Sequence, residues 1–236
     1  MKKSIFIALF CILSHSFMAQ SQTNNTNRRV VIGVNIGPSI DWLSPRTVDY
    51  KKDGTILGLR YGIPVDINFT EGDNYYFSTG LKFAHSGGEL LFTGIPVEYP
   101  ESTTDIHRKY RTLYMSIPTG VKLKTPSFSN FVIGGNFGLE HGFLLSSKHT
   151  DVYYMNGKEI KDQSKQEHKE ALFFRESVYI GPGVEYIIKN DLRVSFYINY
   201  SYTISNFFKK KAKNDVTAVR EKGHLGAVEF LFGFSF

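Results

Sequence analysis

The sequence is poor in cysteine, proline and long hydrophobic runs, three features that mark common protein classes. Its 236 residues include one cysteine, Cys11, and eight prolines. A single cysteine excludes a disulfide framework and a cysteine-based zinc site. Beyond the first twenty residues, no apolar run approaches the roughly 20 residues that a membrane-spanning helix needs, so a helical membrane protein is excluded. With 42% hydrophobic residues, the chain is also unlike a disordered protein.

Motifs that would indicate catalysis are missing as well. The sequence has no Walker A loop and no GxGxxG, HExxH, CxxC or GxSxG pattern. We therefore expect no enzymatic activity, no cofactor and no bound metal. One alternative stays open: a catalytic triad that combines His85 or His141 with residues of other strands. Their sequence neighbours Ser86 and Glu140 cannot complete it, because adjacent residues of a strand face opposite sides.

Residues 1–21 have the layout of a signal peptide. Lys2 and Lys3 precede an apolar stretch from Ile5 to Leu13, and small residues follow. Cleavage is predicted after Ser21, with cleavage after Ala19 as the alternative. We expect residues 1–21 to be removed on export, residues 22–28 to form a short mobile segment and residues 29–236 to form one barrel domain. Loss of Lys2 and Lys3 lowers the net charge from +6 to +4, which does not indicate nucleic-acid binding.

From residue 29 onward the hydrophobic pattern has a period of two, which predicts β-strands. In each of eight segments, large apolar residues alternate with glycine, serine or charged residues. The segments are 30–42, 57–69, 75–83, 113–123, 133–143, 178–186, 194–204 and 228–236.

The connections between these segments alternate in length. TEGDN, TPSFSN and KND are short, whereas the segments that follow Trp42, His85, Leu145 and Ile204 are long and polar. This alternation is typical of outer-membrane barrels, which have short periplasmic turns and long extracellular loops. The predicted fold is therefore all-β: an eight-stranded antiparallel transmembrane β-barrel, located in the cell outer membrane.

The apolar face of the strands is predicted to point outward, to lipid. An eight-stranded barrel has an interior just wide enough for side chains, and the apolar face carries residues too large to fit there. The opposite face holds five cations and five anions, a balanced set that suits a closed, ion-paired plug. The alternative is a soluble sandwich on which these charges are solvated. The predicted charge network of the interior is Asp41, Arg60, Asp66, Lys82, Lys122, Lys124, Glu140, Glu185, Arg193 and Glu229.

Aromatic residues are predicted to form a girdle at each membrane interface. The loop-side girdle is expected to contain Trp42, Phe92, Tyr110, Phe143 and Phe173. The turn-side girdle is expected to contain Phe69, Tyr75, Phe131, Tyr186 and Phe236.

The fourth loop has a skewed charge, whereas the third, Ser147 to Glu170, is charged but balanced. Cations at the outer surface can bind the phosphates of lipopolysaccharide. The alternative is a solvated loop without a ligand. The predicted contacts with anionic lipid are Lys209, Lys210, Lys211, Lys213, Arg220 and Lys222.

Three segments carry a family resemblance: the last strand VEFLFGFSF, the Ile117-Pro118 step in LYMSIPTGVKLK and the glycine-rich strand GGNFGLEHG. With these, the chain resembles the PorT-like outer-membrane β-barrel family of Bacteroidota. The resemblance implies a small barrel whose Phe236 is part of the signal for the barrel-assembly machinery. It also implies a link to secretion, because the PorT protein itself is implicated in an apparatus that exports surface proteins.

The function expected from the sequence is a structural or binding role through the extracellular loops. The expected partners are outer-membrane lipids and lipopolysaccharide, the barrel-assembly machinery during biogenesis, and an envelope or secretion complex; nucleic acid is not expected. Three alternatives stay open: an accessory component of a PorT-type secretion apparatus, a lipid-modifying barrel enzyme and a porin for small solutes.

Overall fold

A computed structural model describes residues 29–46, 49–94, 103–155, 158–162, 171–189, 192–209 and 222–236. Within these ranges the chain forms nine β-strands. They are β1 (Val30–Pro45), β2 (Tyr50–Asn68), β3 (Tyr75–Gly94), β4 (Thr104–Lys124), β5 (Phe131–Met155), β6 (Lys158–Asp162), β7 (Phe174–Lys189), β8 (Leu192–Thr203) and β9 (Gly223–Ser235). No helix in the described ranges has the length and apolar character needed to cross a membrane.

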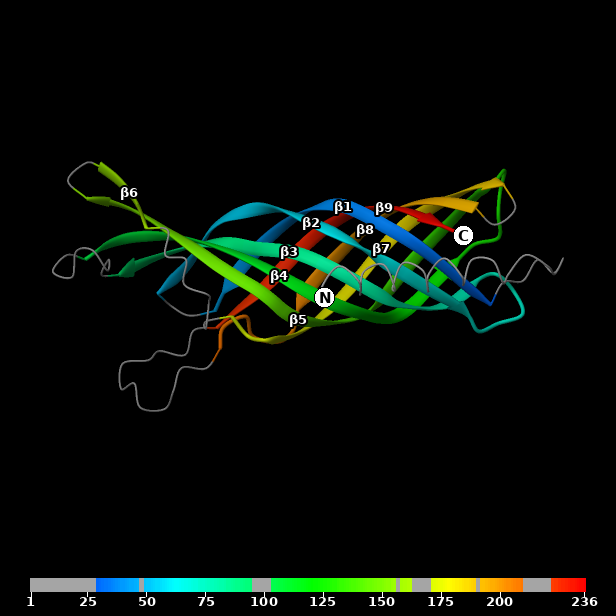
Figure 1. Cartoon of the computed structure of the whole chain (residues 1–236), viewed down its shortest axis with the longest axis horizontal. Helices are drawn as coiled ribbons and strands as arrows, with labels where there is room; N and C mark the ends of the chain where they lie inside the picture. The colour runs from blue at the N-terminus through cyan, green and yellow to red at the C-terminus, as the bar shows by residue number, and fades with distance from the viewer. Residues whose placement is uncertain are drawn as a thin grey trace, which may run out of the picture.

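Eight of the described strands close into a ring of antiparallel pairs. Strands β1 to β5 pair in sequence order, β5 continues to β7, β8 and β9, and β9 pairs back with β1. Strand β6 pairs with the far end of β5 and forms a hairpin that projects from the ring (Figure 1). The predicted eight-stranded antiparallel barrel is confirmed.

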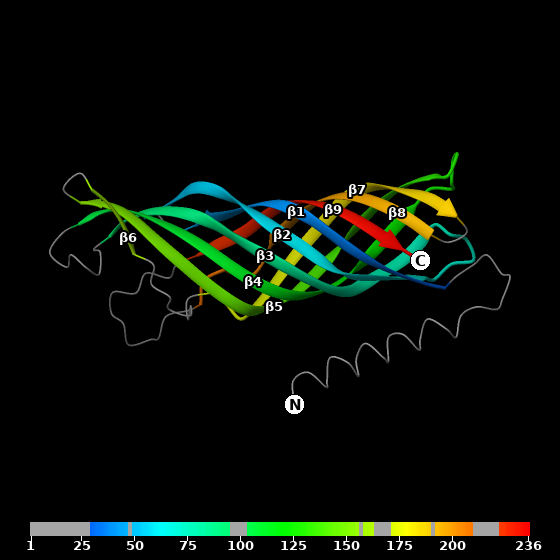
Figure 2. The ribbon, with the colours of Figure 1, turned by 45° about the horizontal axis from the view of Figure 1, so that its top comes forward.

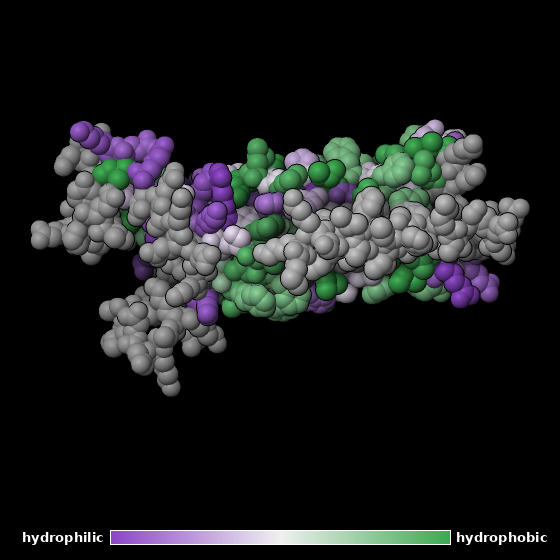
Figure 3. Space-filling model, viewed as in Figure 1, coloured by the Kyte–Doolittle hydropathy of each residue, from purple (hydrophilic) through white to green (hydrophobic). Residues whose placement is uncertain are grey.

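Alternation along each strand places apolar side chains on the outside. Ile36, Ile63, Ile180 and Phe232 are between 46% and 63% exposed, whereas their neighbours on the other face are buried or partly buried. Hydrophobic residues cover the middle of the barrel and polar residues gather toward the end that bears β6 (Figure 3). An exposed apolar belt around a polar interior is the arrangement that a lipid environment requires.

The two ends of the barrel differ. At one end, called the turn side, residues 69–74, 125–130 and 190–191 connect the strands, and the C-terminus lies there (Figure 1). Ser129 and Asn130 adopt positive φ angles of 47° and 68° in one of these connections. Asparagine tolerates this conformation, which lets the chain reverse within a few residues.

At the other end, called the loop side, the strands run further than their hydrophobic pattern predicts. Strand β2 begins at Tyr50 rather than Leu57, β3 continues to Gly94 and β5 to Met155. Only residues 46–49 separate β1 from β2, and part of the predicted third loop is the β5–β6 hairpin. Beyond the membrane both faces of a strand meet polar surroundings, so the sequence there has no reason to alternate. Figure 2 shows these ends extending past the barrel.

Two residues of the predicted loop-side girdle were placed wrongly. Phe92 on β3 lies on the same face as its register partner Ile106, which is 4% exposed. Tyr110 is 1% exposed and points into the barrel, where it contacts Phe207 and Phe208. The reason is its position on β4, where Tyr110, Thr112, Tyr114 and Ser116 are buried and face inward. An aromatic residue near an interface can serve either face, and only the register decides which.

Candidate functional site

The interior contains a layer of three cations and three carboxylates, which we call the central ion layer. Arg60 contacts Asp41 and also donates from Nε to Glu229 Oε1 at 2.9 Å. Lys82 Nζ lies 2.7 Å from Glu140 Oε2 and 2.8 Å from Glu229 Oε2. The sixth member is Arg175, whose Nη2 lies 3.1 Å from Glu140 Oε1. Strands β1, β2, β3, β5, β7 and β9 each supply one group.

A second set, the turn-side ion layer, closes the other half of the interior. Lys122 Nζ lies 2.5 Å from Asp66 Oδ2, and the hydroxyl of Ser78 donates to Asp66 Oδ1 at 2.6 Å. Glu185 accepts a hydrogen bond from Tyr197 at 2.8 Å and pairs with Lys124 at 2.9 Å. Burying these charges is tolerable because each has partners of opposite sign and further hydrogen bonds.

Arg193 completes the turn-side ion layer. Its Nη1 lies 3.5 Å from Glu185, and its Nη2 lies 2.8 Å from Asp73 in the turn between β2 and β3. Each layer therefore contains three cations and three carboxylates. The structure brings all ten residues of the predicted charge network into these layers and adds Arg175 and Asp73, which the sequence reasoning missed.

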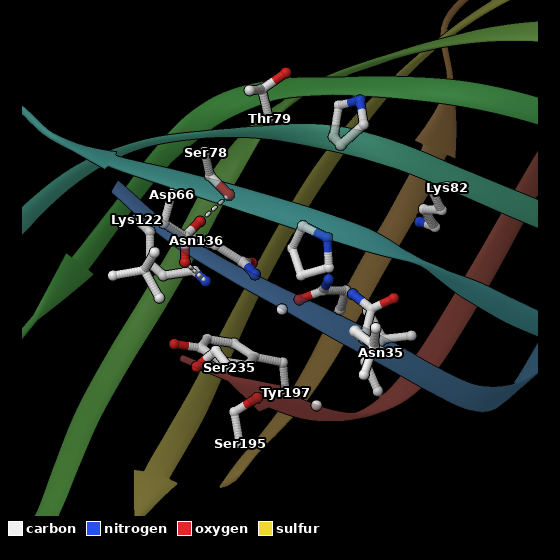
Figure 4. Close-up of a pocket in the computed structure, with 18 of the residues that line it drawn as sticks. Asn35, Asp66, Ser78, Thr79, Lys82, Lys122, Asn136, Ser195, Tyr197 and Ser235 are labelled. Atoms are coloured by element: carbon white, nitrogen blue, oxygen red, sulfur yellow. Dashed lines mark hydrogen bonds and ion pairs between the residues drawn. The ribbon is translucent and has the colours of Figure 1, made fainter. Parts of the chain in front are cut away.

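A cavity of about 90 Å³, lined by residues of both layers and by apolar side chains, lies in the interior (Figure 4). It reaches from Lys82 and Glu140 to Asp66, Lys122 and Tyr197. The side-chain oxygens of Asn136 and Asn199 also belong to its lining and are buried without a hydrogen-bond partner in the protein. The cavity exceeds the roughly 10–15 Å³ that one water needs, so it has room for water beside these two oxygens.

The loop-side half of the interior is closed by apolar side chains, which we call the apolar seal. Phe207 and Phe208, which follow β8, fold inward and are 2% and 3% exposed. Their rings lie 5.4 and 5.8 Å from that of Tyr110. The sequence reasoning missed this seal, although two adjacent phenylalanines in a polar loop were a signal. The seal consists of Leu43, Ala84, Leu90, Tyr110, Tyr114, Ala171, Phe207, Phe208 and Leu225.

Above the seal, the strand ends form an ordered sheet held by ion pairs, which we call the loop-side extension (Tyr50–Gly54, Glu89–Gly94, Thr104–Lys109, Ser147–Met155 and β6). Arg108 makes two hydrogen bonds of 2.7 Å to the carboxylate of Asp151 on β5. Lys109 Nζ lies 2.5 Å from Glu89 Oε1 on β3. Because a bidentate pair fixes both side chains, the extension is a defined surface rather than a set of free loops.

Three polar side chains face outward within the apolar belt. His141 Nδ1 lies 3.0 Å from Glu176 Oε2, and its Nε2 lies 2.9 Å from Thr119 Oγ1. A carboxylate only accepts, so in the neutral ring Nδ1 donates to Glu176 and Nε2 accepts from Thr119. Thr119 lies between Ile117 and Val121 on the outward face of β4. Polar groups that face lipid must satisfy one another, which these three do.

The remaining predicted residues are placed only in part. Lys209 and Lys222 belong to the described residues, whereas Lys210, Lys211, Lys213, Arg220, the predicted signal peptide and residues 22–28 lie outside them. Phe236 exchanges main-chain hydrogen bonds of 2.9 and 3.2 Å with Ile32, which ties the end of β9 to β1. Among the described residues, no group of three or more His, Cys, Asp or Glu side chains could hold a metal ion.

No curated protein matches the chain. Among solved structures, Ail of Yersinia pestis is 14% identical, with 89% of this chain and 100% of that chain covered and a TM-score of 0.39. Neisserial surface protein A is 10% identical, with 89% and 98% covered and a TM-score of 0.41. The protease OmpT of Escherichia coli is 9% identical, with 92% and 99% covered and a TM-score of 0.41.

Most of the chain also matches a protein family. Residues 18–209 match the family described as "Outer membrane protein beta-barrel domain". The match covers more than half of the chain and includes strands β1 to β8. The apolar belt, the closed ring and the ion-paired interior are the features that such a domain needs in lipid. The chain therefore belongs to the outer membrane protein β-barrel family and is a small barrel of the outer membrane.

Proposed function

We propose that this protein is a closed barrel that anchors a binding surface on the outside of the cell. The observation that carries the proposal is the length of the strands on the loop side. Strand β5 has 25 residues, whereas a tilted strand needs about 9–11 residues to cross the membrane. The excess forms the loop-side extension, whose ion pairs hold it in a defined shape.

The interior supports a surface role over a role in transport. A solute that entered from the loop side would meet the apolar seal, then the central ion layer and then the turn-side ion layer. Opening either layer would separate buried charges from their partners, which costs several kcal/mol per ion. A porin for small solutes is therefore the weaker alternative.

A lipid-modifying enzyme is also less well supported than the surface role. Thr119, His141 and Glu176 do have the hydroxyl–imidazole–carboxylate order of a hydrolytic triad. The three side chains lie on the lipid-facing side, and Thr119 is the third of six outward positions between Leu123 and Leu113 on β4. Hydrolysis needs water and an acyl ester at the hydroxyl. The middle of the apolar belt offers neither.

Lipopolysaccharide is the ligand that we propose for the basic fourth loop, which includes Lys209 and Lys222. Lipid phosphates attract such cations at the surface with about 1 kcal/mol per residue. An accessory part in a PorT-type secretion apparatus is the second candidate. It is favoured by the Ile117-Pro118 step and the glycine-rich start of β5, which resemble the PorT-like family.

Site-specific photocrosslinking in living cells tests the proposed surface role. A photoreactive phenylalanine analogue replaces Tyr154 on β5 of the extension, where the side chain is 57% exposed. The matched control replaces Phe128 in a turn at the opposite end, which is 81% exposed. We expect adducts from position 154 with a surface component. No adduct from position 154, or adducts only from position 128, would overturn the assignment of the extension as the binding surface.

A further inference from the structure

Two cations face each other on the outer rim of the barrel. Arg111 on β4 is the direct register partner of Lys148 on β5. Both side chains are exposed, and within the described residues neither has an ion pair or a hydrogen bond from its side chain. Like charges directly opposite each other on neighbouring strands destabilise a sheet. The position therefore favours an anion that both cations share.

The surroundings leave both cations open. On the other side of Arg111, the register partner on β3 is Gly87, which has no side chain to cover the guanidinium. Strand β5 pairs with β7 as far as Phe143 and with β6 from Asp151, so no described strand pairs with β5 at Lys148 on that side. The neighbouring Lys109 is already paired with Glu89 and does not compete for the anion.

The height of the pair is that of lipid head groups. On the outward face of β4, Arg111 follows the apolar positions Met115 and Leu113 toward the loop side. On β5, Leu145 is 52% exposed and precedes Lys148 in the same direction. The cations thus stand directly above the apolar belt, and a ligand bound here would meet charge above and hydrocarbon below.

A register shift between β4 and β5 creates this pair. The pairing runs Leu113 with Ser146 and then Tyr114 with Leu144, so Leu145 is an extra residue on β5. Without this bulge, Arg111 would face residue 147 instead of Lys148. Bulges often redirect a side chain at the rim of a barrel, and here the redirected side chain is the second cation.

We propose that Arg111 and Lys148 form a binding site for a phosphate group of lipopolysaccharide. The guanidinium of Arg111 offers two parallel donors to the phosphate oxygens, and Lys148 adds a point charge from the neighbouring strand. The acyl chains of the same molecule would lie along Leu113 and Leu145. The proposal rests on the proposed surface role. It adds a second site for lipopolysaccharide, separate from the fourth loop.

The test uses the full barrel refolded in detergent and purified lipopolysaccharide as the probe, with and without its lipid A phosphates. The double variant Arg111→Gln/Lys148→Gln should bind phosphorylated lipopolysaccharide about thirtyfold more weakly at low salt. The control Arg29→Gln/Lys189→Gln removes the same charge at the turn side, the opposite end of the barrel, and should retain wild-type affinity. Arg111→Lys keeps the charge but loses the two parallel donors of the guanidinium. Its affinity should lie between those of the double variant and the control.

Heat-dependent gel mobility establishes that each variant is folded. Equal affinities of the wild type and the double variant, or equal wild-type affinity for dephosphorylated lipopolysaccharide, would overturn the site. If at the same time neutralising the fourth loop abolishes binding, lipopolysaccharide is still a ligand and only the site has failed. Equal competition by phosphatidylglycerol micelles would overturn the assignment to lipopolysaccharide, because the site would then take phospholipid.

Discussion

The ammonium of Lys82 on β3 lies 2.8 Å from the carboxylate of Glu229 on β9, across the interior of the barrel. Strands β1 and β2 separate β3 from β9 in the ring, so this contact connects walls that do not pair. Glu229 also accepts from Arg60, which makes one carboxylate the partner of two buried cations. The central ion layer thus acts as a cross-brace between opposite parts of the sheet.

Removing the charge of Glu229 should destabilise the barrel strongly. In Glu229→Gln, Arg60 and Lys82 keep only one carboxylate partner each, and a buried charge without compensation costs about 3–5 kcal/mol. The measurement is the urea midpoint of unfolding in detergent micelles. Glu159→Gln serves as the control, because its ion pair with Lys161 is exposed to solvent and should contribute little to stability. An unchanged midpoint for Glu229→Gln would show that the layer contributes no stability.

The closed interior predicts that purified protein in planar bilayers gives no steady, high-conductance openings. The variant Phe207→Ala/Phe208→Ala should also stay closed, because the two ion layers remain beneath the weakened seal. Reproducible conductance of the wild type that changes in Arg60→Ala or Glu185→Ala would instead indicate a channel through both layers.

The apolar seal predicts a packing effect at Phe207, which is 2% exposed. Replacing a buried phenylalanine by alanine removes apolar packing and leaves a cavity, at a cost of about 3–5 kcal/mol. Phe207→Ala should therefore lower the free energy of unfolding by an amount in this range. Phe128→Ala, at a side chain that is 81% exposed, should change it little. Equal unfolding curves for the two variants would mean that Phe207 does not pack against the seal in solution.

The basic fourth loop predicts a salt-dependent decrease in affinity for lipopolysaccharide. Replacing Lys209, Lys210, Lys211 and Lys213 by glutamine should weaken binding at low salt, by about 1 kcal/mol for each phosphate that the loop no longer binds. The difference should shrink at high salt, where the charges are screened. The comparison variant replaces Lys51, Lys52, Lys158 and Lys161 by glutamine, which removes the same charge from the extension. Its affinity for lipopolysaccharide should fall less than that of the loop variant. Equal affinities of the wild type and the loop variant at low salt would leave the loop without a ligand.

Much of the barrel could be predicted because its main rule is local. A strand that faces lipid on one side and the interior on the other must alternate, so Ile36 and Gly37, or Val184 and Glu185, already show their faces in the sequence. Where that rule ends, prediction failed. The extension of β5 to Met155 has polar surroundings on both faces, and Tyr110 could serve either the interface or the interior.

The contacts of the interior join residues that are far apart in the sequence. The sequence predicted which charged residues face the interior, but not which of them pair. A balanced number of charges predicted that they would pair, but not that Arg60 would contact Glu229, which is 169 residues away. Arg175 and Asp73 completed the two layers from positions that the alternating segments did not include. The Arg111–Lys148 pair depended on one bulged residue, Leu145, which no periodicity indicates.

The sequence by itself determined the strands, the outward direction of their apolar faces and the polar character of the interior, because each follows from neighbouring residues and the solvent they must meet. The tertiary structure alone decided which charges meet, how Phe207 and Phe208 close the loop side and which cations face each other at the rim. These depend on the closure and register of the ring, and a shift of one residue between two strands would exchange the partners of every side chain along them.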